Sequence, residues 1–262
     1  MKIIKICRFC SKAKPETTFN TDAHTFPEFM GNKKLFSNDE CDKCNSFFGN
    51  TIEKAAADFF LPNRAVLGVY GKGGNKQART ADGSLSLFNG MVNGAPHVIA
   101  VAHSKEAEKY IVEDSSKGLT ISVPRRPHVP IAVYKCFVKM AISVMTENEL
   151  GDFADTISWL LEQEQRNFYA AERKLWLKVI YVPNTKKSDY PPYWFYKLTD
   201  TQSNKNHVLF YTIWSGMCCG IEVPTSKNLN CLDITELINP YESKGYSIEN
   251  FDLSSSIKTD GS

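Results

Sequence analysis

Two Cys-x2-Cys pairs constrain the fold of this chain more than any other feature of its sequence. Cys7 and Cys10 form the first pair, and Cys41 and Cys44 form the second pair after an interval of thirty residues. Two cysteines on a tight turn can reach one metal ion, and two such turns supply the four thiolates of a tetrahedral Zn2+ site, with Zn–S bonds of about 2.3 Å. We therefore expect a structural zinc site, because four thiolates leave no coordination position open.

The composition indicates a globular protein. The chain has 262 residues, of which 42% are hydrophobic and 23% charged, and its net charge is +2. A substantial core is therefore expected, and binding to nucleic acid by overall charge alone is excluded. Eight cysteines are too few for a disulfide scaffold, no secretory leader opens the sequence, and no apolar run approaches about 18 residues. These features predict a cytoplasmic protein with no membrane span, in which the remaining cysteines are plain thiols: Cys136, Cys218, Cys219 and Cys231.

The stretch around the two pairs predicts a zinc-stapled hairpin followed by a helix. The hairpin is expected to carry the first pair, and it leads to His24. Apolar residues recur at spacings of three and four up to Phe59, so we expect one helix that begins near Cys41 and is ended by Pro62. This outline is that of a treble-clef (ββα-metal) zinc module over residues 1–64.

The remainder of the chain predicts a mixed α+β domain over residues 65–252 and a Ser-rich, disordered tail over residues 253–262. Apolar periodicity predicts a hairpin of two helices over residues 132–144 and 151–176. Runs of β-branched and aromatic residues predict strands, antiparallel toward the C-terminus, at residues 97–102, 119–123, 177–182, 194–198, 208–214 and 219–223. The fold class expected for the whole chain is therefore α+β.

The first sixty residues also carry a family resemblance. The motif His24-x2-Pro27-x3-Gly31-Asn32, followed by Cys41-x2-Cys44-Asn45-x3-Gly49-x3-Glu53, resembles the zinc-containing HNH endonuclease family. The resemblance implies hydrolysis of phosphodiester bonds, with His24 as the general base and Asn45 as a ligand of a catalytic Mg2+ or Mn2+ ion. Asn38 is our candidate for the middle Asn of the family, which orients the loop and the histidine, and Asn32 competes with it.

One position departs from the family pattern. The family often has an acidic residue or a histidine immediately before the catalytic histidine, where this chain has Ala23. Alternation along a strand sends Asp22 and His24 to the same face, so Asp22 is the candidate second ligand of the cation. Glu53, about two helical turns beyond Asn45, is a weaker candidate. The structural alternatives are that His24 is an ordinary loop histidine and that Asn45 only braces the start of the helix.

Basic residues after the zinc module are candidates for contacts to the nucleic-acid backbone. Residues 65–139 contain ten Lys or Arg against five Asp or Glu. The glycine-rich stretch over residues 68–79 lacks the Gly-Lys-Ser/Thr ending of a phosphate-binding loop, so it is either a flexible connection or a contact to DNA. The turn rich in proline near residue 125 is likewise either a solvated linker or a phosphate contact. The candidate residues are Lys72, Lys76, Arg79, Arg125 and Arg126.

These observations lead to a metal-dependent HNH endonuclease that acts on DNA, with structural Zn2+ and catalytic Mg2+ or Mn2+. A role in bacterial defence is suggested by the family. The expected partners are DNA and either a regulatory partner protein or a second copy in a homodimer, and restraint of the activity by a partner or a ligand is expected. The alternative is a non-catalytic zinc module that binds nucleic acid or protein, in which Ala23 marks a decayed active site. A third hypothesis is a zinc-stabilised regulator whose C-terminal domain binds a ligand.

Overall fold

The structure of this chain is a computed structural model in which two compact units are distinguished. The first unit combines residues 1–56 with residues 129–258, and the second combines residues 57–128 with residues 259–262. The N-terminal segment is thus grouped with the C-terminal half of the chain. The sequence instead predicts a boundary after residue 64 that separates these two parts. The functional division into a zinc module and a second domain stays a prediction. The described residues are 4–69, 76–114, 118–123, 125–169, 173–182, 188–200, 205–227, 232–235, 237 and 244–260.

The N-terminal segment contains a short antiparallel hairpin that carries His24, followed by helices, whereas the hairpin expected around Cys7 and Cys10 is a turn with one isolated β-bridge between Ile6 and Ala13. His24 in the first strand of the hairpin lies opposite Phe36 in the second strand. A single 3-10 turn and a loop connect the two strands. The elements are β1 (Ala23–His24), η1 (Glu28–Met30), β2 (Phe36–Ser37), α1 (Asp42–Asn50), α2 (Ile52–Phe59) and α3 (Leu61–Leu67).

The helical stretch differs from the single helix that we expected. It breaks at Thr51, whose hydroxyl donates to the carbonyl of Phe47 at 2.6 Å, and such back-bonding by threonine bends helices. The expectation that Pro62 ends the helix is wrong, because Pro62 lies in the first turn of α3. A proline is tolerated there because the N–H groups of the first turn have no acceptor within the helix.

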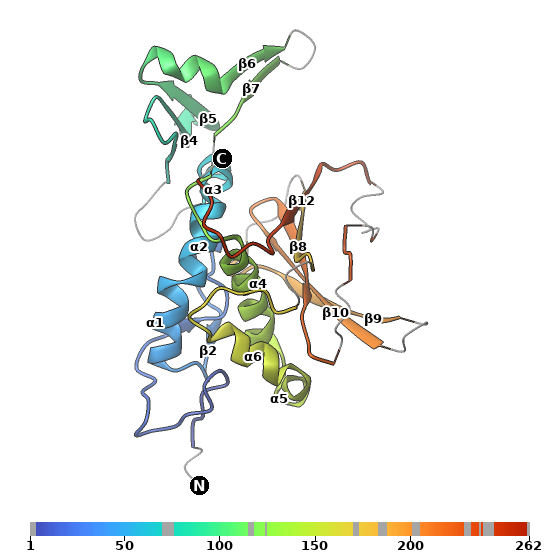
Figure 1. Ribbon diagram of the computed structural model, residues 1–262. Coiled ribbons are helices and arrows are strands. Elements are labelled where there is room, and N and C mark those ends of the chain that lie inside the picture. Colours follow the sequence, from blue (N-terminus) through green and yellow to red (C-terminus); the bar gives the residue numbers. More distant parts are fainter. Residues whose placement is uncertain are drawn as a thin grey trace. The chain divides into compact units, whose positions relative to one another are not determined.

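Helix α4 (Pro130–Val144) is the central element of the first unit (Figure 1). All of its residues from Pro130 to Ser143 are buried, so it packs on every side. The hydroxyl of Tyr134 donates to the carbonyl of Glu222 in the sheet at 2.5 Å, and Lys139 contacts the N-terminal segment. The two parts of the first unit are therefore packed on one shared helix.

The second helix of the predicted hairpin is shorter than expected. It consists of α5 (Glu147–Leu150), η3 (Gly151–Phe153) and α6 (Ala154–Leu160), and α6 packs against α4. The prediction of a helix up to residue 176 is wrong because the chain folds back onto Trp159. The indole of Trp159 donates to the carbonyl of Arg166 at 2.8 Å, and its ring packs against Phe168.

The C-terminal strands form one five-stranded antiparallel sheet, which confirms the prediction for this region (Figure 1). Phe210 faces the N-terminal segment, where its ring packs near Phe26. Leu209 and Tyr211 therefore point to the opposite face, where they belong to a second cluster of buried residues. The strands are β8 (Trp176–Tyr181), β9 (Tyr193–Asp200), β10 (Lys205–Trp214), β11 (Met217–Val223) and β12 (Ile248–Asp252), in the spatial order β12-β8-β11-β10-β9.

The second unit contains two small antiparallel sheets beside α3. Its core includes Leu61, Ala65, Ala78 and Leu87. The long hairpin turns at Asn93 and Gly94, which both have positive φ, as the tight turns of β-hairpins require. The elements are β3 (Ala78–Arg79), β4 (Leu85–Val92), β5 (Ala95–Ala102), η2 (Lys105–Tyr110), β6 (Ile111–Asp114) and β7 (Gly118–Ile121).

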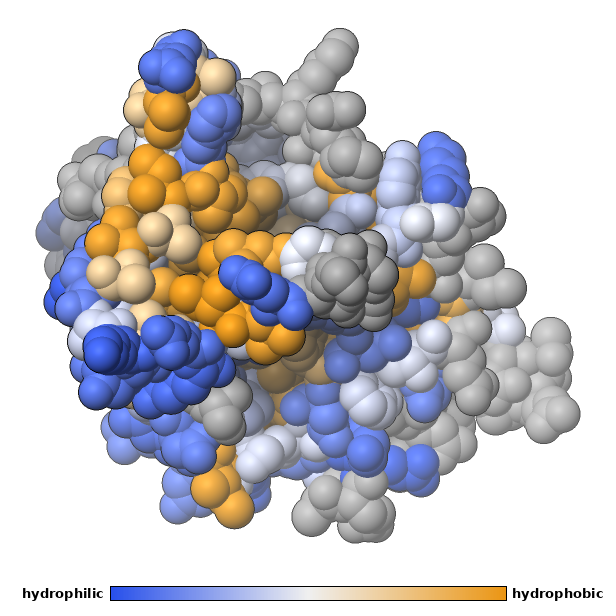
Figure 2. Space-filling view, turned by 90° about the horizontal axis from the view of Figure 1, so that it is seen from above, coloured by the Kyte–Doolittle hydropathy of each residue, from blue (hydrophilic) through white to orange (hydrophobic). Residues whose placement is uncertain are grey.

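The second unit exposes many apolar side chains. Met91, Val98, Val112 and Leu119 are each at least half exposed. Figure 2, which views the molecule from above, shows a broad apolar patch on its visible face. No helix in the described part of the chain is long and apolar enough to span a membrane.

The C-terminal tail, expected to be disordered from residue 253, makes main-chain hydrogen bonds in the described region. Leu253 is 2% exposed, and its N–H donates to the carbonyl of Leu175 at 2.8 Å. The carbonyl of Ser255 accepts a hydrogen bond from the N–H of Ile131 at the start of α4. These contacts tie the segment after β12 to the rest of the first unit.

Candidate metal centre and active site

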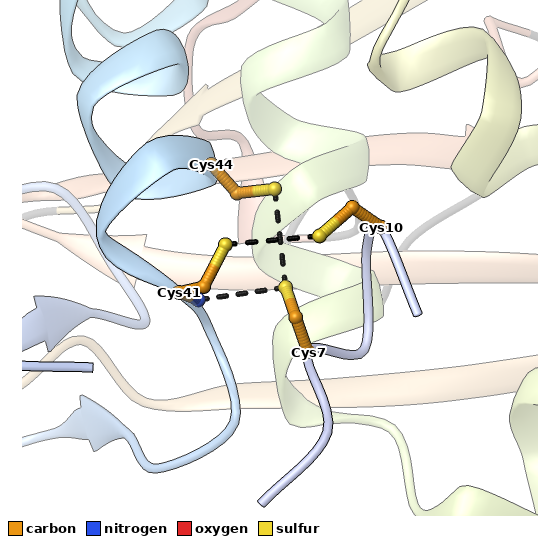
Figure 3. A group of neighbouring side chains, drawn as sticks. All are labelled: Cys7, Cys10, Cys41 and Cys44. Carbon is orange, nitrogen blue, oxygen red and sulfur yellow. Dashed lines mark hydrogen bonds between the residues drawn. The ribbon is translucent and has the colours of Figure 1, made fainter. Parts of the chain in front are cut away.

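The four cysteines of the two pairs meet at one point (Figure 3). Their sulfur atoms all lie within 4.8 Å of one another, with Cys7 and Cys44 at 3.8 Å and Cys10 and Cys41 at 3.7 Å. Four sulfurs at about 2.3 Å from a common tetrahedral ion lie about 3.8 Å apart. The spacing therefore fits a structural Zn2+ ion, and the donor set is complete without any further ligand.

The local fold explains how the cysteines converge. The first pair lies on a tight turn closed by hydrogen bonds from Ser11 N–H to the carbonyl of Cys7 and from Cys7 N–H to the carbonyl of Lys12. Cys41 caps the N-terminus of α1, and Cys44 lies in its first turn. The N–H of Cys41 also donates to the sulfur of Cys7 at 3.4 Å, a contact that favours the thiolate. The cysteine cluster thus joins the N-terminal turn to the start of α1.

The other described cysteines lie away from this site as buried thiols, as the sequence predicted. Burial raises the pKa of Cys218 to about 12 and the pKa of Cys136 well above its ordinary value. Cys219 is fully buried beside Cys218. Cys231 lies outside the described residues.

His24 is half-buried in β1, and both of its ring nitrogens have neighbours. Nε2 lies 3.0 Å from Oε1 of Glu28, and Nδ1 lies 3.4 Å from Nδ2 of Asn32. Its ring also packs against Phe36 across the hairpin, with ring centroids 4.8 Å apart. A carboxylate at Nε2 favours the tautomer that carries the proton there, which leaves the lone pair on Nδ1.

Asn32, rather than Asn38, braces the loop that follows His24. Asn32 is 2% exposed, and its amide donates to the carbonyls of Phe26 and Leu35 at 2.8 Å each. Its Oδ1 accepts from the N–H groups of Lys34 and Leu35 at 3.3 and 3.0 Å. The side chain of Asn38 is exposed. Our sequence hypothesis assigns the orientation of this loop to Asn38. In the structure Asn32, the other candidate, makes the hydrogen bonds that hold the loop.

Asn45 and Asp22 come from segments that are fastened together. The amide of Asn45 on α1 donates to Oγ1 of Thr21 at 3.3 Å, next to the exposed Asp22. The carboxylate of Asp42 in α1 accepts hydrogen bonds from the N–H groups of Asn20 and Thr21 at 2.9 and 2.8 Å. These bonds, together with those of Thr18 and Thr21 hydroxyls, hold the pKa of Asp42 well below its usual range. The structure therefore brings Asn45 close to the segment of Asp22.

Ala23 is fully buried between the exposed Asp22 and the half-buried His24. This alternation agrees with the strand geometry that we expected, in which Asp22 and His24 share one face. A side chain at position 23 points into the core. The acidic residue or histidine that the family often has at this position is therefore replaced here by a buried alanine, which offers no ligand atom.

A cluster of buried charges lies behind His24. The ammonium group of Lys139 on α4 lies 3.1 Å from Glu40 and 3.2 Å from Glu53, and it donates to the carbonyl of His24 at 2.8 Å. Burial raises the pKa of Glu40 to about 7, while Lys139 acts in the opposite direction. Burial alone would lower the pKa of Lys139, but Glu53 and Glu40 raise it. Glu53 is thus engaged with α4 and not with Asn45.

Arg8 makes a second connection to α4 from the turn that carries Cys7 and Cys10. Its guanidinium forms a two-pronged ion pair with Asp39, at 2.8 and 2.6 Å. The same group donates to the carbonyls of Ile142 and Met145 at 2.7 and 3.1 Å, at the C-terminal end of α4. Partial burial opposes ionisation of Asp39, but Arg8 lowers the pKa of this carboxyl below its ordinary value. A cation at a helix C-terminus is electrostatically favourable.

The basic residues proposed to contact nucleic acid lie in the second unit, apart from Lys72, which is outside the described residues. Lys76 is half-buried, and Arg79 on β3 is exposed, with its Nε 3.4 Å from Oγ of Ser86. Arg125 packs over the ring of Phe59, and Arg126 lies 3.8 Å from Asp58. Arg125 and Arg126 thus have partners within their own unit.

Sequence reasoning missed two residues that touch His24. Glu28 was interpreted only as part of a short helical turn, although its position four residues after His24 allows the contact once the loop turns back. Lys139 lies 115 residues away, and its only signal was a charged residue inside a strongly apolar helix. A lysine at such a position requires buried partners, which the sequence alone does not identify.

Comparison with protein families supports the resemblance found in the sequence. Residues 7–61 match the family model of HNH endonuclease. The match contains both cysteine pairs, His24, Asn32, Asn38 and Asn45. Neither the curated proteins nor the solved structures contain a match to this chain.

Proposed function

We propose that residues 7–61 form the active site of a metal-dependent endonuclease that hydrolyses phosphodiester bonds of DNA. The observation that carries the proposal is the position of His24, on a hairpin whose preceding residues, Asn20 and Thr21, are hydrogen-bonded to Asp42 of α1, within a segment that matches the HNH endonuclease family. The order of turn, hairpin and helix supports a treble-clef (ββα-metal) module. Four cysteine ligands assign zinc a structural role.

His24 is the general base in this mechanism. Glu28 holds the proton on Nε2, so the lone pair of the neutral ring is on Nδ1. Asn32 lies 3.4 Å from Nδ1 but uses its amide hydrogens on the carbonyls of Phe26 and Leu35, which are both closer. Nδ1 therefore retains its capacity to accept a proton from water that attacks the phosphate.

Asn45 and Asp22 are the residues that would hold a divalent cation. They offer amide and carboxylate oxygens, the ligands that Mg2+ and Mn2+ prefer, and Mg2+ commonly uses only one or two protein carboxylates and keeps several waters. Asn45 is hydrogen-bonded to Thr21, the residue before Asp22, so the two candidate ligands belong to adjoining segments. When bound, the cation would offset negative charge that develops on the phosphate.

The cation requirement tests this assignment. We expect purified protein to relax supercoiled plasmid DNA with Mg2+ or Mn2+ and not with EDTA at matched zinc content. Asn45→Ala should raise the Mg2+ concentration needed for half-maximal cleavage, whereas Asn50→Ala on the same helix, where Asn50 bonds to Ser46, should not. Cleavage that persists in EDTA, or an unchanged Mg2+ requirement in Asn45→Ala, would contradict the proposal.

A non-catalytic nucleic-acid-binding module is the alternative, and the buried Ala23 is the observation that favours it. Such a module binds DNA equally well with and without Mg2+. Its affinity falls when Arg79, Arg125 and Arg126 are neutralised, and the dependence of binding on salt becomes shallower. The endonuclease instead loses cleavage without the cation, so the two functions are separated by comparing binding and cleavage in the same samples.

A further inference from the structure

Lys139 connects the proposed catalytic histidine to a helix that lies outside the matched family segment. Its side chain is fully buried, and its ammonium group donates to the main-chain carbonyl of His24 at 2.8 Å. Lys139 belongs to α4, and both residues are in the first unit. The contact therefore joins the hairpin of the active site to the C-terminal half of the chain.

A protonated lysine suits this contact. Its ammonium group donates hydrogen bonds to the carbonyl of His24 at 2.8 Å and to the carboxylate of Glu53 at 3.2 Å, and Glu40 is an ion-pair partner at 3.1 Å. Two carboxylates thus compensate the buried charge, while one N–H group of the ammonium is used on the peptide of His24. A buried ion pair contributes little stability on balance, which leaves the bond to the carbonyl as a specific feature of the arrangement.

The hairpin that carries His24 is too short to position itself. β1 and β2 pair over only two residues each, and an isolated two-stranded hairpin is marginally stable at best. The carbonyl of residue 24 belongs to the same residue as the imidazole, so its position sets the direction in which the ring projects. A misplacement of about 1 Å in an active site can cost about 100-fold in rate.

We infer that Lys139 is a positioning residue for His24, so that α4 is part of the catalytic unit. This inference rests on the proposed function for its kinetic consequence, but the contact itself can be tested without any activity. Lys135 supplies a matched control, because it lies one turn earlier on α4 and is also fully buried, and it packs over the ring of Trp159.

The test compares Lys139→Met with Lys135→Met in the full chain, with zinc content and thermal unfolding measured first. We expect Lys139→Met to lower kcat about 10- to 100-fold with little change in KM, because the base is displaced and substrate binding is retained. Hydrogen–deuterium exchange of amides 23–37 should accelerate in Lys139→Met and stay at the wild-type rate in Lys135→Met. Wild-type kcat and wild-type exchange in a folded, zinc-loaded Lys139→Met protein would overturn the inference.

Two further comparisons keep the result decisive. If Lys139→Met does not fold, the double variant with Glu53→Gln removes one of the two carboxylates that lose their cation, and it is compared with Glu53→Gln alone. If wild-type protein cleaves nothing with any cation, the proposed function fails, while faster exchange of amides 23–37 in Lys139→Met alone still supports the positioning contact. Equal exchange in both variants would overturn the contact whatever the activity.

Discussion

At the residue scale, Asn32 and Asn38 show that a sequence motif does not by itself identify the side chain that braces a loop. Asn32 makes four hydrogen bonds to main-chain groups from a buried position, whereas Asn38 is exposed six residues later. The backbone groups that Asn32 satisfies belong to the loop between β1 and β2, and one of them, the carbonyl of Leu35, also accepts a hydrogen bond from the N–H of Thr25 at 3.2 Å. We therefore assign the bracing of the loop to Asn32.

Replacement of these asparagines tests the assignment. Asn32→Ala should lower the free energy of unfolding by about 2–4 kcal/mol, because it leaves buried main-chain groups without hydrogen-bond partners. Asn38→Ala, at an exposed position, should change it by about 0.5 kcal/mol or less. Urea unfolding of both variants measures the difference, and equal effects would refute the assignment.

The buried Lys135 predicts a dependence of stability on pH. Its ammonium group makes no hydrogen bond with the described residues, and burial lowers its pKa from 10.5 to about 8. Below pH 8 the lysine is protonated in both states, and the cost of burying the charge is fully present. Between about pH 8 and pH 10.5 the unfolded chain binds the proton more strongly, so this cost disappears as the pH rises.

Lys135→Met should therefore stabilise the protein at pH 7, by about 2–3 kcal/mol, and by much less at pH 10. Methionine keeps an apolar contact with Trp159, so the loss of the lysine leaves no large cavity. Lys174→Met, at a side chain that is 60% exposed, should show no such pH dependence. Chemical unfolding at both pH values gives the comparison, and an equal effect of Lys135→Met at pH 7 and pH 10 would exclude a buried charge.

At the element scale, the predicted zinc site joins the N-terminal turn to α1. Apart from the cysteines, the ring of Phe9 in the turn packs against Phe48 of α1, with ring centroids 4.8 Å apart, and an isolated β-bridge joins Ile6 and Ala13 within the turn itself. Cys10→Ser should therefore lose zinc and lower the thermal midpoint. Cys219→Ala, far from the sulfur cluster, should retain one zinc ion per chain. Metal analysis of both purified variants tests the site, and full zinc content in Cys10→Ser would contradict it.

The elements also show what the sequence could predict. Periodic apolar patterns identified α4 and the strands β8 to β11, because these elements bury a continuous face and local spacing reports it. The same periodicity failed after Leu160, where Trp159 bonds to the carbonyl of Arg166 and the chain folds back. The sequence predicts that Pro62 ends a helix, but Pro62 lies in the first turn of α3. Proline is compatible with both positions, so the residue type alone does not distinguish them.

The candidate site likewise contains some residues that the sequence predicts and others that it does not. The cysteine pairs and His24 were predictable, because metal ligands and the family motif have a fixed spacing in the sequence. The brace at Asn32 and the contact of Glu28 depend on the course of a loop, and Lys139 depends on packing between segments 115 residues apart. Such long-range contacts leave no local pattern from which they could be read.

At the scale of the whole first unit, the matched segment is not a self-contained module. Arg8 and Lys139 connect it to α4, and the rings of Phe26 and Phe29 pack near Phe210 and Trp214 of the sheet. The C-terminal half of the chain therefore supplies part of the core on which the hairpin rests. In this account, phosphodiester cleavage is a property of the first unit as a whole.

The most direct test of the account is the single-turnover rate of DNA cleavage by His24→Ala in saturating Mg2+, with zinc content matched to wild type. We predict a rate at least about 100-fold below wild type, because a general base contributes about 10²–10⁴-fold. His97→Ala, at an exposed histidine of β5, should cleave at the wild-type rate. Cleavage by zinc-loaded His24→Ala at the wild-type rate would contradict the central claim that this histidine is the base.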